Sequence, residues 1–135
     1  GGPAGDLFIV ITVNEHPIFT REEDDIWCEV PIGFVMAALG GEIEVPTLTA
    51  KEKVKIPAGT QTGRVFRLKN RGIANVRGHG LGDLVVKIVV ETPTNLTKKQ
   101  KELLEEFASL SGDNEHPMSA GFWDKVKELF TVAEK

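Results

Sequence analysis

Apolar and polar residues alternate along several short stretches of the first ninety residues, as in strands with one buried and one exposed face. This alternation predicts strands at residues 42–45, 51–56 and 64–69, and a more continuous apolar run predicts another at 26–32. An apolar segment bracketed by glycine, residues 33–40, predicts a short internal helix. Short strands joined by turns favour a mainly β fold, a β-sandwich, over a parallel sheet of βαβ units.

Polar segments separate the first predicted strands. Residues 14–18 are predicted to turn the chain, and the acidic run at residues 22–25 is predicted to form a polar loop. That run lacks the Asp-x-Asp-x-Asp-Gly spacing and the terminal Glu of a calcium-binding loop. A solvated hairpin loop is the favoured interpretation.

One strand pattern occurs twice. The segment that begins Gly5-Asp6-Leu7 is echoed by the segment that begins Gly82-Asp83-Leu84, and an apolar, β-branched run follows both. The second copy closes a unit of strands, whereas the first stands at the start of the chain. Internal repetition of this kind indicates repeated structural units. We therefore expect a fragment that starts on the last strand of one domain and contains a related second domain.

The periodicity changes after Pro93. Thr97 and Gln100 have the spacing of a capping box, which predicts a helix start, and Gly112 is a plausible stop. The helix carries one apolar face formed by Leu103, Leu104, Phe107 and Leu110. A polar linker at residues 111–117 precedes a second predicted helix, roughly residues 119–132. Its apolar stripe consists of Phe122, Trp123, Val126, Leu129 and Phe130.

Composition narrows the function classes. A chain of 135 residues with 41% hydrophobic and 27% charged residues is ordinary for a globular protein. The net charge of −4 argues against a general polyanion binder. The single cysteine, Cys28, can form neither an internal disulfide nor a metal cluster, which favours a reducing compartment. No apolar run approaches the roughly 20 residues of a membrane-spanning helix.

Candidate chemistry is sparse. The glycine-rich stretch at residues 78–82 precedes a predicted strand, so it lacks the helix N-terminus that a phosphate-binding loop needs. His16, His79 and His116 are too widely spaced to suggest a metal site. Cys28 lies in an apolar strand, where a buried and inert thiol is expected. No catalytic constellation is recognisable.

One basic region stands out, and its residues are Arg64, Arg67, Lys69, Arg71 and Arg77. The alternation of polar and apolar residues in the strand at residues 64–69 explains part of this region as the solvent-exposed face of that strand. Only Phe66 is available nearby for base stacking, so nucleic-acid binding is disfavoured. The apolar helix faces are different, because surface of that size is not left in water without a partner. Symmetric pairing of two chains is the natural solution.

These motifs resemble the C-terminal part of the DnaJ family, the J-domain co-chaperones. The residues that carry the resemblance include Gly5-Asp6-Leu7, His16-Pro17-Ile18-Phe19, Val30-Pro31-Ile32, Ala37-Ala38-Leu39-Gly40-Gly41, Val45-Pro46-Thr47-Leu48, Ile56-Pro57-Ala58-Gly59-Thr60-Gln61, Phe66-Arg67-Leu68 and Gly82-Asp83-Leu84. The match spans residues 1 to about 110, and the final helix resembles the tail of many bacterial members.

The resemblance implies two tandem β-sandwich domains followed by a dimerisation helix. Residues 1–15 then correspond to the last strand of the first domain, 16–93 to the second domain, 94–112 to the dimerisation helix, and 113–135 to a linker and C-terminal helix. The J-domain's His-Pro-Asp loop, which stimulates the ATPase of DnaK-type chaperones, has no match here. The zinc module of some members is also missing, so no cofactor is expected in this segment, although the parent could carry zinc.

The implied function is that of a cytoplasmic chaperone scaffold and not of an enzyme. It would pair with a second copy through both helical stripes and would serve a DnaK-type chaperone through other parts of the parent, without binding nucleic acid or membrane. By analogy with the first domain, unfolded polypeptide would bind near Ile43, Val45 and Leu48, unless these residues are simply core. An enzyme with a β-sandwich site and a nucleic-acid-binding or other β-sandwich interaction module are the alternatives.

Overall fold

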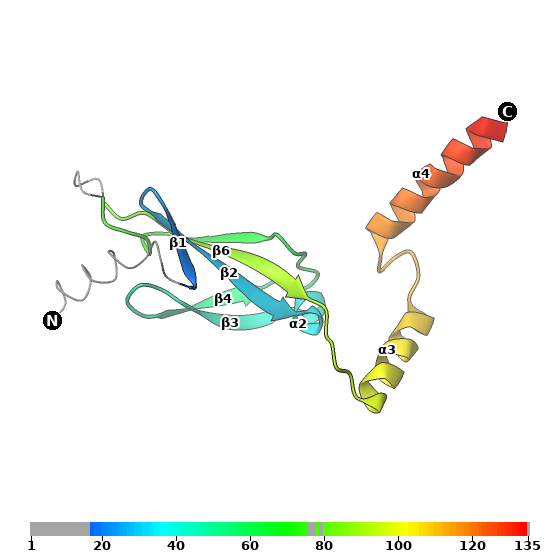
Figure 1. Ribbon diagram of the computed structural model, residues 1–135, viewed down its shortest axis with the longest axis horizontal. Helices are drawn as coiled ribbons and strands as arrows, with labels where there is room; N and C mark the ends of the chain where they lie inside the picture. The colour runs from blue at the N-terminus through cyan, green and yellow to red at the C-terminus, as the bar shows by residue number, and fades with distance from the viewer. Residues whose placement is uncertain (1–16, 76–77, 79, 135) are drawn as a thin grey trace. The chain divides into compact units, whose positions relative to one another are not determined.

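The computed structural model describes residues 17–75, 78 and 80–134. The chain divides into two compact units, residues 1–93 and 94–135. Within the described residues, the first unit contains six strands and a short helix, and the second contains two helices (Figure 1). Both the strand-rich and the helical parts that the sequence predicts are therefore present, and the strand predicted within residues 1–15 lies outside the described residues.

The strands of the first unit form two sheets. They are β1 (Phe19–Glu22), β2 (Asp25–Gly33), β3 (Gly41–Pro46), β4 (Lys51–Ile56), β5 (Val65–Leu68) and β6 (Leu84–Glu91). Four of them form one sheet in the order β1-β2-β6-β5, while β3 and β4 form a separate antiparallel pair. The mainly β fold class is confirmed.

The centre of the larger sheet is a parallel pair, in which β2 and β6 run side by side (Figure 1). Their register aligns Ile26 with Leu84 and Ile32 with Val90. The strand that repeats the start of the chain therefore lies inside the sheet. This position explains its continuous apolar sequence, because both faces of a central strand are buried.

The core lies between the two sheets. Buried side chains of the larger sheet pack with Val45 of β3 and with Val54 and Ile56 of β4. Ile26, Leu84 and Ile88 are completely buried, and burial of each stabilises the fold by about 1.5–3 kcal/mol. Ile43 and Leu48 are partly buried and pack against this core.

Strand β1 corrects the sequence prediction around the acidic run. Phe19–Glu22 pairs antiparallel with β2, so Glu22 ends one strand and Asp25 begins the next. Only Glu23 and Asp24 form the turn, and Glu23 has a positive φ of 57°. The predicted hairpin connection is confirmed, but it is shorter than predicted. Phe19 is the one buried side chain of β1, which is too little apolar pattern to predict a strand.

The short helix α2 (Phe34–Leu39) follows β2 directly. Ala37 is its buried side chain, and the helix ends at Gly40, whose φ is 84°. A Cβ atom at Gly40 would lie 2.9 Å from both the Ala58 nitrogen and the Ile56 oxygen. Glycine is therefore required here for both its backbone conformation and its close packing on the end of β4.

The second unit consists of α3 (Lys98–Leu110) and α4 (Pro117–Glu134). The predicted capping box is present, because the Thr97 side chain accepts from the Gln100 N–H at 3.1 Å and the Gln100 side chain accepts from the Thr97 N–H at 2.9 Å. At the other end, the Ser111 hydroxyl donates to the Phe107 carbonyl. Helix α4 begins two residues earlier than predicted, with Pro117 in the first helical position, where its missing N–H costs nothing.

Candidate functional site

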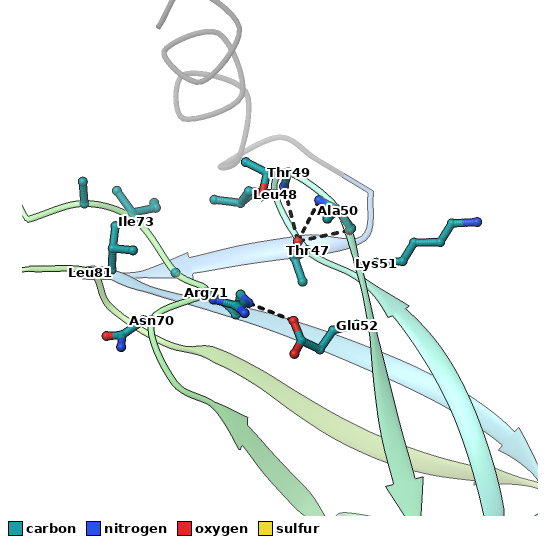
Figure 2. Close-up of a pocket in the computed structure, with 12 residues that line it drawn as sticks. Thr47, Leu48, Thr49, Ala50, Lys51, Glu52, Asn70, Arg71, Ile73 and Leu81 are labelled. Atoms are coloured by element: carbon teal, nitrogen blue, oxygen red, sulfur yellow. Dashed lines mark hydrogen bonds and ion pairs between the residues drawn. The ribbon is translucent and has the colours of Figure 1, made fainter. Parts of the chain in front are cut away.

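A cleft of about 590 Å³ lies at the end of the first unit where β3 turns into β4 (Figure 2). One wall is residues 47–52, from the β3–β4 turn into β4, and the other is residues 70–74 with Leu81. The apolar side chains Leu48, Ile73 and Leu81 line it together with an ion pair between Arg71 and Glu52. An apolar pocket with a few polar groups is the usual form of a binding site.

Thr47 builds the first wall. Its backbone N–H donates to the Ala50 carbonyl at 2.7 Å, and its hydroxyl accepts from the Ala50 N–H at 2.9 Å. The hydroxyl also accepts from the Thr49 N–H at 3.3 Å. These bonds close a tight turn and fix the residue at its tip, Leu48, between the core and the cleft. Leu48 is half-buried in that position.

Two glycines build the second wall. The N–H of Gly72 donates to the Gly82 carbonyl, and the Gly82 N–H donates to the Ile73 carbonyl, each at 2.9 Å. A Cβ atom at Gly82 would lie 2.1 Å from the Asp24 oxygen, and one at Gly72 would lie 2.5 Å from the same atom. Only glycine permits this close approach of three chain segments. The approach buries Ile73, which is 4% exposed.

A network of charges holds the base of this wall. Arg67 Nη1 lies 3.1 Å from Asp25 Oδ2 and 3.0 Å from Asp83 Oδ2. Asp83 also accepts from the Asn70 N–H at 3.1 Å. The pKa of the Asp83 carboxyl is held below its ordinary value, mainly by the hydrogen bond from the Arg67 guanidinium and to a smaller extent by the one from the Asn70 N–H. Hydrogen bonds to the ionised form have this effect.

The predicted basic region is consequently occupied by contacts within the fold. Arg67 and Arg71 are bound to carboxylates, and the Arg64 guanidinium lies 5.1 Å from the centre of the Phe66 ring. Arg77 lies outside the described residues. The side chains that a nucleic acid would need are thus already engaged at three of the five positions.

The three residues predicted to bind polypeptide lie in different environments. Val45 is fully buried in the core, Ile43 is partly buried against it, and Leu48 lines the cleft. Sequence reasoning missed Ile73, Leu81 and Arg71 as cleft residues. They come from a glycine-rich segment without periodicity, and the positions of Gly72 and Gly82 beside single apolar residues were the only available signal.

The helical unit leaves its apolar stripes exposed in the single chain. On α3, Leu103 is 51% and Phe107 48% exposed, and Leu104 is half-buried. On α4 the rings of Phe122 and Trp123 pack edge to face at 5.0 Å, yet both remain more than half exposed. The remaining predicted interface residues are Leu110, Leu129 and Phe130, which are exposed, and Val126, which is half-buried.

The other candidate sites from the sequence were Cys28, the histidines and the glycine-rich stretch. Cys28 is buried, and burial raises the pKa of its thiol, which suppresses the reactive thiolate. Among residues 17–75, 78 and 80–134, no three His, Cys, Asp or Glu side chains are grouped so as to hold a metal ion. Strand β6 follows the glycine-rich stretch at residues 78–82, as predicted, and Ala74 pairs with Leu81. His16 and His79 lie outside the described residues. No helix in the described part of the chain has the length and apolarity to span a bilayer.

The described residues form a two-sheet β domain with a cleft, followed by two amphipathic helices with exposed apolar faces. Residues 1–93 match the family model described as DnaJ C terminal domain, and residues 99–132 match the model described as Chaperone protein DnaJ C-terminal region. The chain belongs to the DnaJ C-terminal domain family. It is 58% identical over 130 residues to a Chaperone protein DnaJ of Bacillus licheniformis, and the match covers 96% of this chain and 35% of that protein. The chain thus spans about a third of the length of this relative.

Proposed function

We propose that this chain is the dimerising and polypeptide-binding part of a DnaJ-type co-chaperone that assists a DnaK-type chaperone in protein folding. The observation that carries the proposal is the match of one chain to both C-terminal family models, in series and over nearly its whole length. The relative's name, Chaperone protein DnaJ, supports the same assignment. A cytoplasmic location follows from this proposal and agrees with the unpaired Cys28.

Dimerisation is assigned to the helical unit. Leu103, Leu104 and Phe107 would each contribute about 1.5–3 kcal/mol on full burial, and the single chain buries none of them fully. Stable interfaces bury about 1,200–2,000 Å² in total, which a single 13-residue helix does not readily supply. The α4 stripe, with Trp123 and Phe130, therefore belongs to the same proposed interface, since aromatic residues dominate such contacts.

Polypeptide binding is assigned to the first unit, at the cleft and the neighbouring edge of β3. Leu48 and Leu81 give the cleft an apolar surface for a client side chain, and the buried Ile73 lies behind them. Strand β3 pairs only with β4 among the described strands, so its other edge is available for main-chain hydrogen bonds. Contact with the DnaK-type chaperone is assigned to other parts of the parent.

No catalytic role and no cofactor are proposed for this chain. Lys51, Glu52 and Arg71 are the titratable residues that line the cleft, and the last two form an ion pair. Arg67 is bound by two aspartates. Neither arrangement pairs a nucleophile with a base. Nucleic-acid binding is not proposed either, because carboxylates already hold the central arginines.

Two measurements on the purified chain test this proposal. Sedimentation equilibrium should give a dimer at micromolar concentration, and a chemically unfolded protein diluted into buffer should aggregate more slowly in the presence of the chain. A monomer that leaves aggregation unchanged would overturn the proposal. The variant Leu48→Asp separates the two properties: it should no longer suppress aggregation but should remain a dimer.

A further inference from the structure

The outer edge of β3 has a defined set of backbone groups that no other described strand pairs with. At the end of the hairpin Thr47 lies opposite Ala50 and donates its backbone N–H to the Ala50 carbonyl, as in a hydrogen-bonded pair. Since such pairs alternate along an antiparallel ladder, Val45 (opposite Glu52) and Ile43 (opposite Val54) direct their N–H and C=O groups toward β4. Glu42 and Glu44 therefore direct theirs away from β4.

The same two residues carry the charge of that edge. Side chains on one face of a strand recur every second residue, so Glu42 and Glu44 share the exposed face of β3. Glu42 is 3.9 Å from Lys53 with both side chains more than half exposed, which is a weak pair. Glu44 forms no ion pair with a described residue. The lysines of this small sheet, Lys51, Lys53 and Lys55, are all on β4.

The two edges of the pair thus differ. The β4 side is lined with lysine and is approached by Arg71, which binds Glu52. The β3 side is acidic, and none of the described strands pairs with it. A strand added to β3 would place alternate side chains opposite Glu42 and Glu44, and the intervening ones beside the partly buried Ile43.

We propose that the β3 edge selects extended polypeptide segments in which lysine or arginine alternates with an apolar residue. This inference rests on the proposed polypeptide-binding function and adds its substrate class. The backbone of the client bonds to Glu42 and Glu44, its basic side chains pair with their carboxylates, and its apolar side chains cover Ile43. Pro46 is the next residue of β3 on the side away from β4, and because it has no N–H it cannot donate to an added strand.

Three capped, fluorescent eight-residue peptides test the proposal: one alternates lysine with isoleucine, one alternates serine with isoleucine, and one alternates glutamate with isoleucine. Anisotropy with the full chain at low salt should rank them in that order. Each opposite-charge cross-strand pair shifts affinity modestly, so two pairs should favour the lysine peptide over the serine peptide by about two- to thirty-fold.

The variant E42Q/E44Q should reduce the lysine-to-serine ratio to nearly one. The control E102Q/E105Q changes net charge equally but lies on α3, and it should leave the ratio unchanged. N-methylation of alternate peptide amides on the bonding side should weaken binding by at least several-fold. Equal binding of the methylated peptide would overturn strand addition.

The possible failures are distinguishable. Equal affinity for all three peptides overturns the substrate class and leaves polypeptide binding intact. A preference that survives E42Q/E44Q, or one for the glutamate peptide, overturns the assignment to β3. If no peptide binds and unfolded protein is not protected, both this inference and the proposed function fail.

Discussion

Arg71 Nε lies 2.8 Å from Glu52 Oε2, so the segment after β5 is bound to β4 within the cleft (Figure 2). The two side chains are 47% and 34% exposed. A pair so accessible to water is expected to contribute little to stability. Its position instead joins the two walls of the cleft.

We therefore expect Arg71→Ala to change the free energy of unfolding by less than about 1 kcal/mol. Client binding at Leu48 and Leu81 should change by a larger factor than this small loss of stability accounts for. Urea denaturation and peptide anisotropy provide the two measurements. A double-mutant cycle with Glu52→Gln isolates the pair, and a coupling above about 2 kcal/mol would contradict this account.

Gly82→Ala should be severely destabilising. Its Cβ atom would lie 2.1 Å from the backbone oxygen of Asp24, and backbone cannot move aside as a flexible side chain can. Overpacking costs about 1–3 kcal/mol or more, and here we expect the upper end of that range. Gly33→Ala is the matched control, because a Cβ atom added there would have no other atom within 4 Å and the φ of Gly33 is −69°. Similar urea midpoints for the two variants would refute the close-approach argument.

Asp83 makes the stability of the fold depend on pH in the acidic range. Its folded pKa is lowered, by the Arg67 guanidinium first and the Asn70 N–H second, relative to an unfolded value of about 3.9. The stabilisation is therefore fully present above that unfolded value and is lost as pH falls through the folded pKa. Asp83→Asn should flatten the decline in urea midpoint below about pH 4, while the two proteins should have parallel profiles between about pH 5 and 7. An unchanged acid profile would argue against this role.

Local patterns predicted much of this molecule. The capping box at Thr97 and Gln100 needs only residues three positions apart, and α3 begins where that spacing placed it. Strand β4 alternates visibly, and its bounds were predicted to the residue. Helix α2 and the buried state of Cys28 also follow from short apolar runs.

The cleft could not be predicted in the same way, because its walls meet through contacts between distant residues. Ile73 and Leu81 line it only because Gly72 and Gly82 approach Asp24, which lies far earlier in the chain. The parallel pairing of β2 with β6 is likewise non-local. The alternation of apolar and polar residues indicates which face of a strand is buried, but it does not indicate which strand lies beside it.

The proposed dimer should depend on the α3 stripe. Replacing Leu104 and Phe107 with Asp would place two charges in a desolvated contact and cost at least about 3 kcal/mol, which is more than about a hundred-fold in Kd. Sedimentation should show a folded monomer, with circular dichroism of the β unit unchanged. E102Q/E105Q, on the same helix, should remain dimeric. A dimer that persists after the Asp substitutions would place the interface elsewhere.

Trp123 reports whether α4 joins that dimer. Its indole is 58% exposed in the single chain, so burial in the dimer interface should change its surroundings. In a Trp27→Phe background, which removes the other indole, we expect blue-shifted emission and weak acrylamide quenching at concentrations where the chain is dimeric. Dilution below the dimer Kd, or introduction of the two Asp substitutions on α3, should shift the emission to the red and increase quenching. Emission typical of a solvated indole in the intact dimer would show that α4 stays outside the interface, and would confine dimerisation to α3.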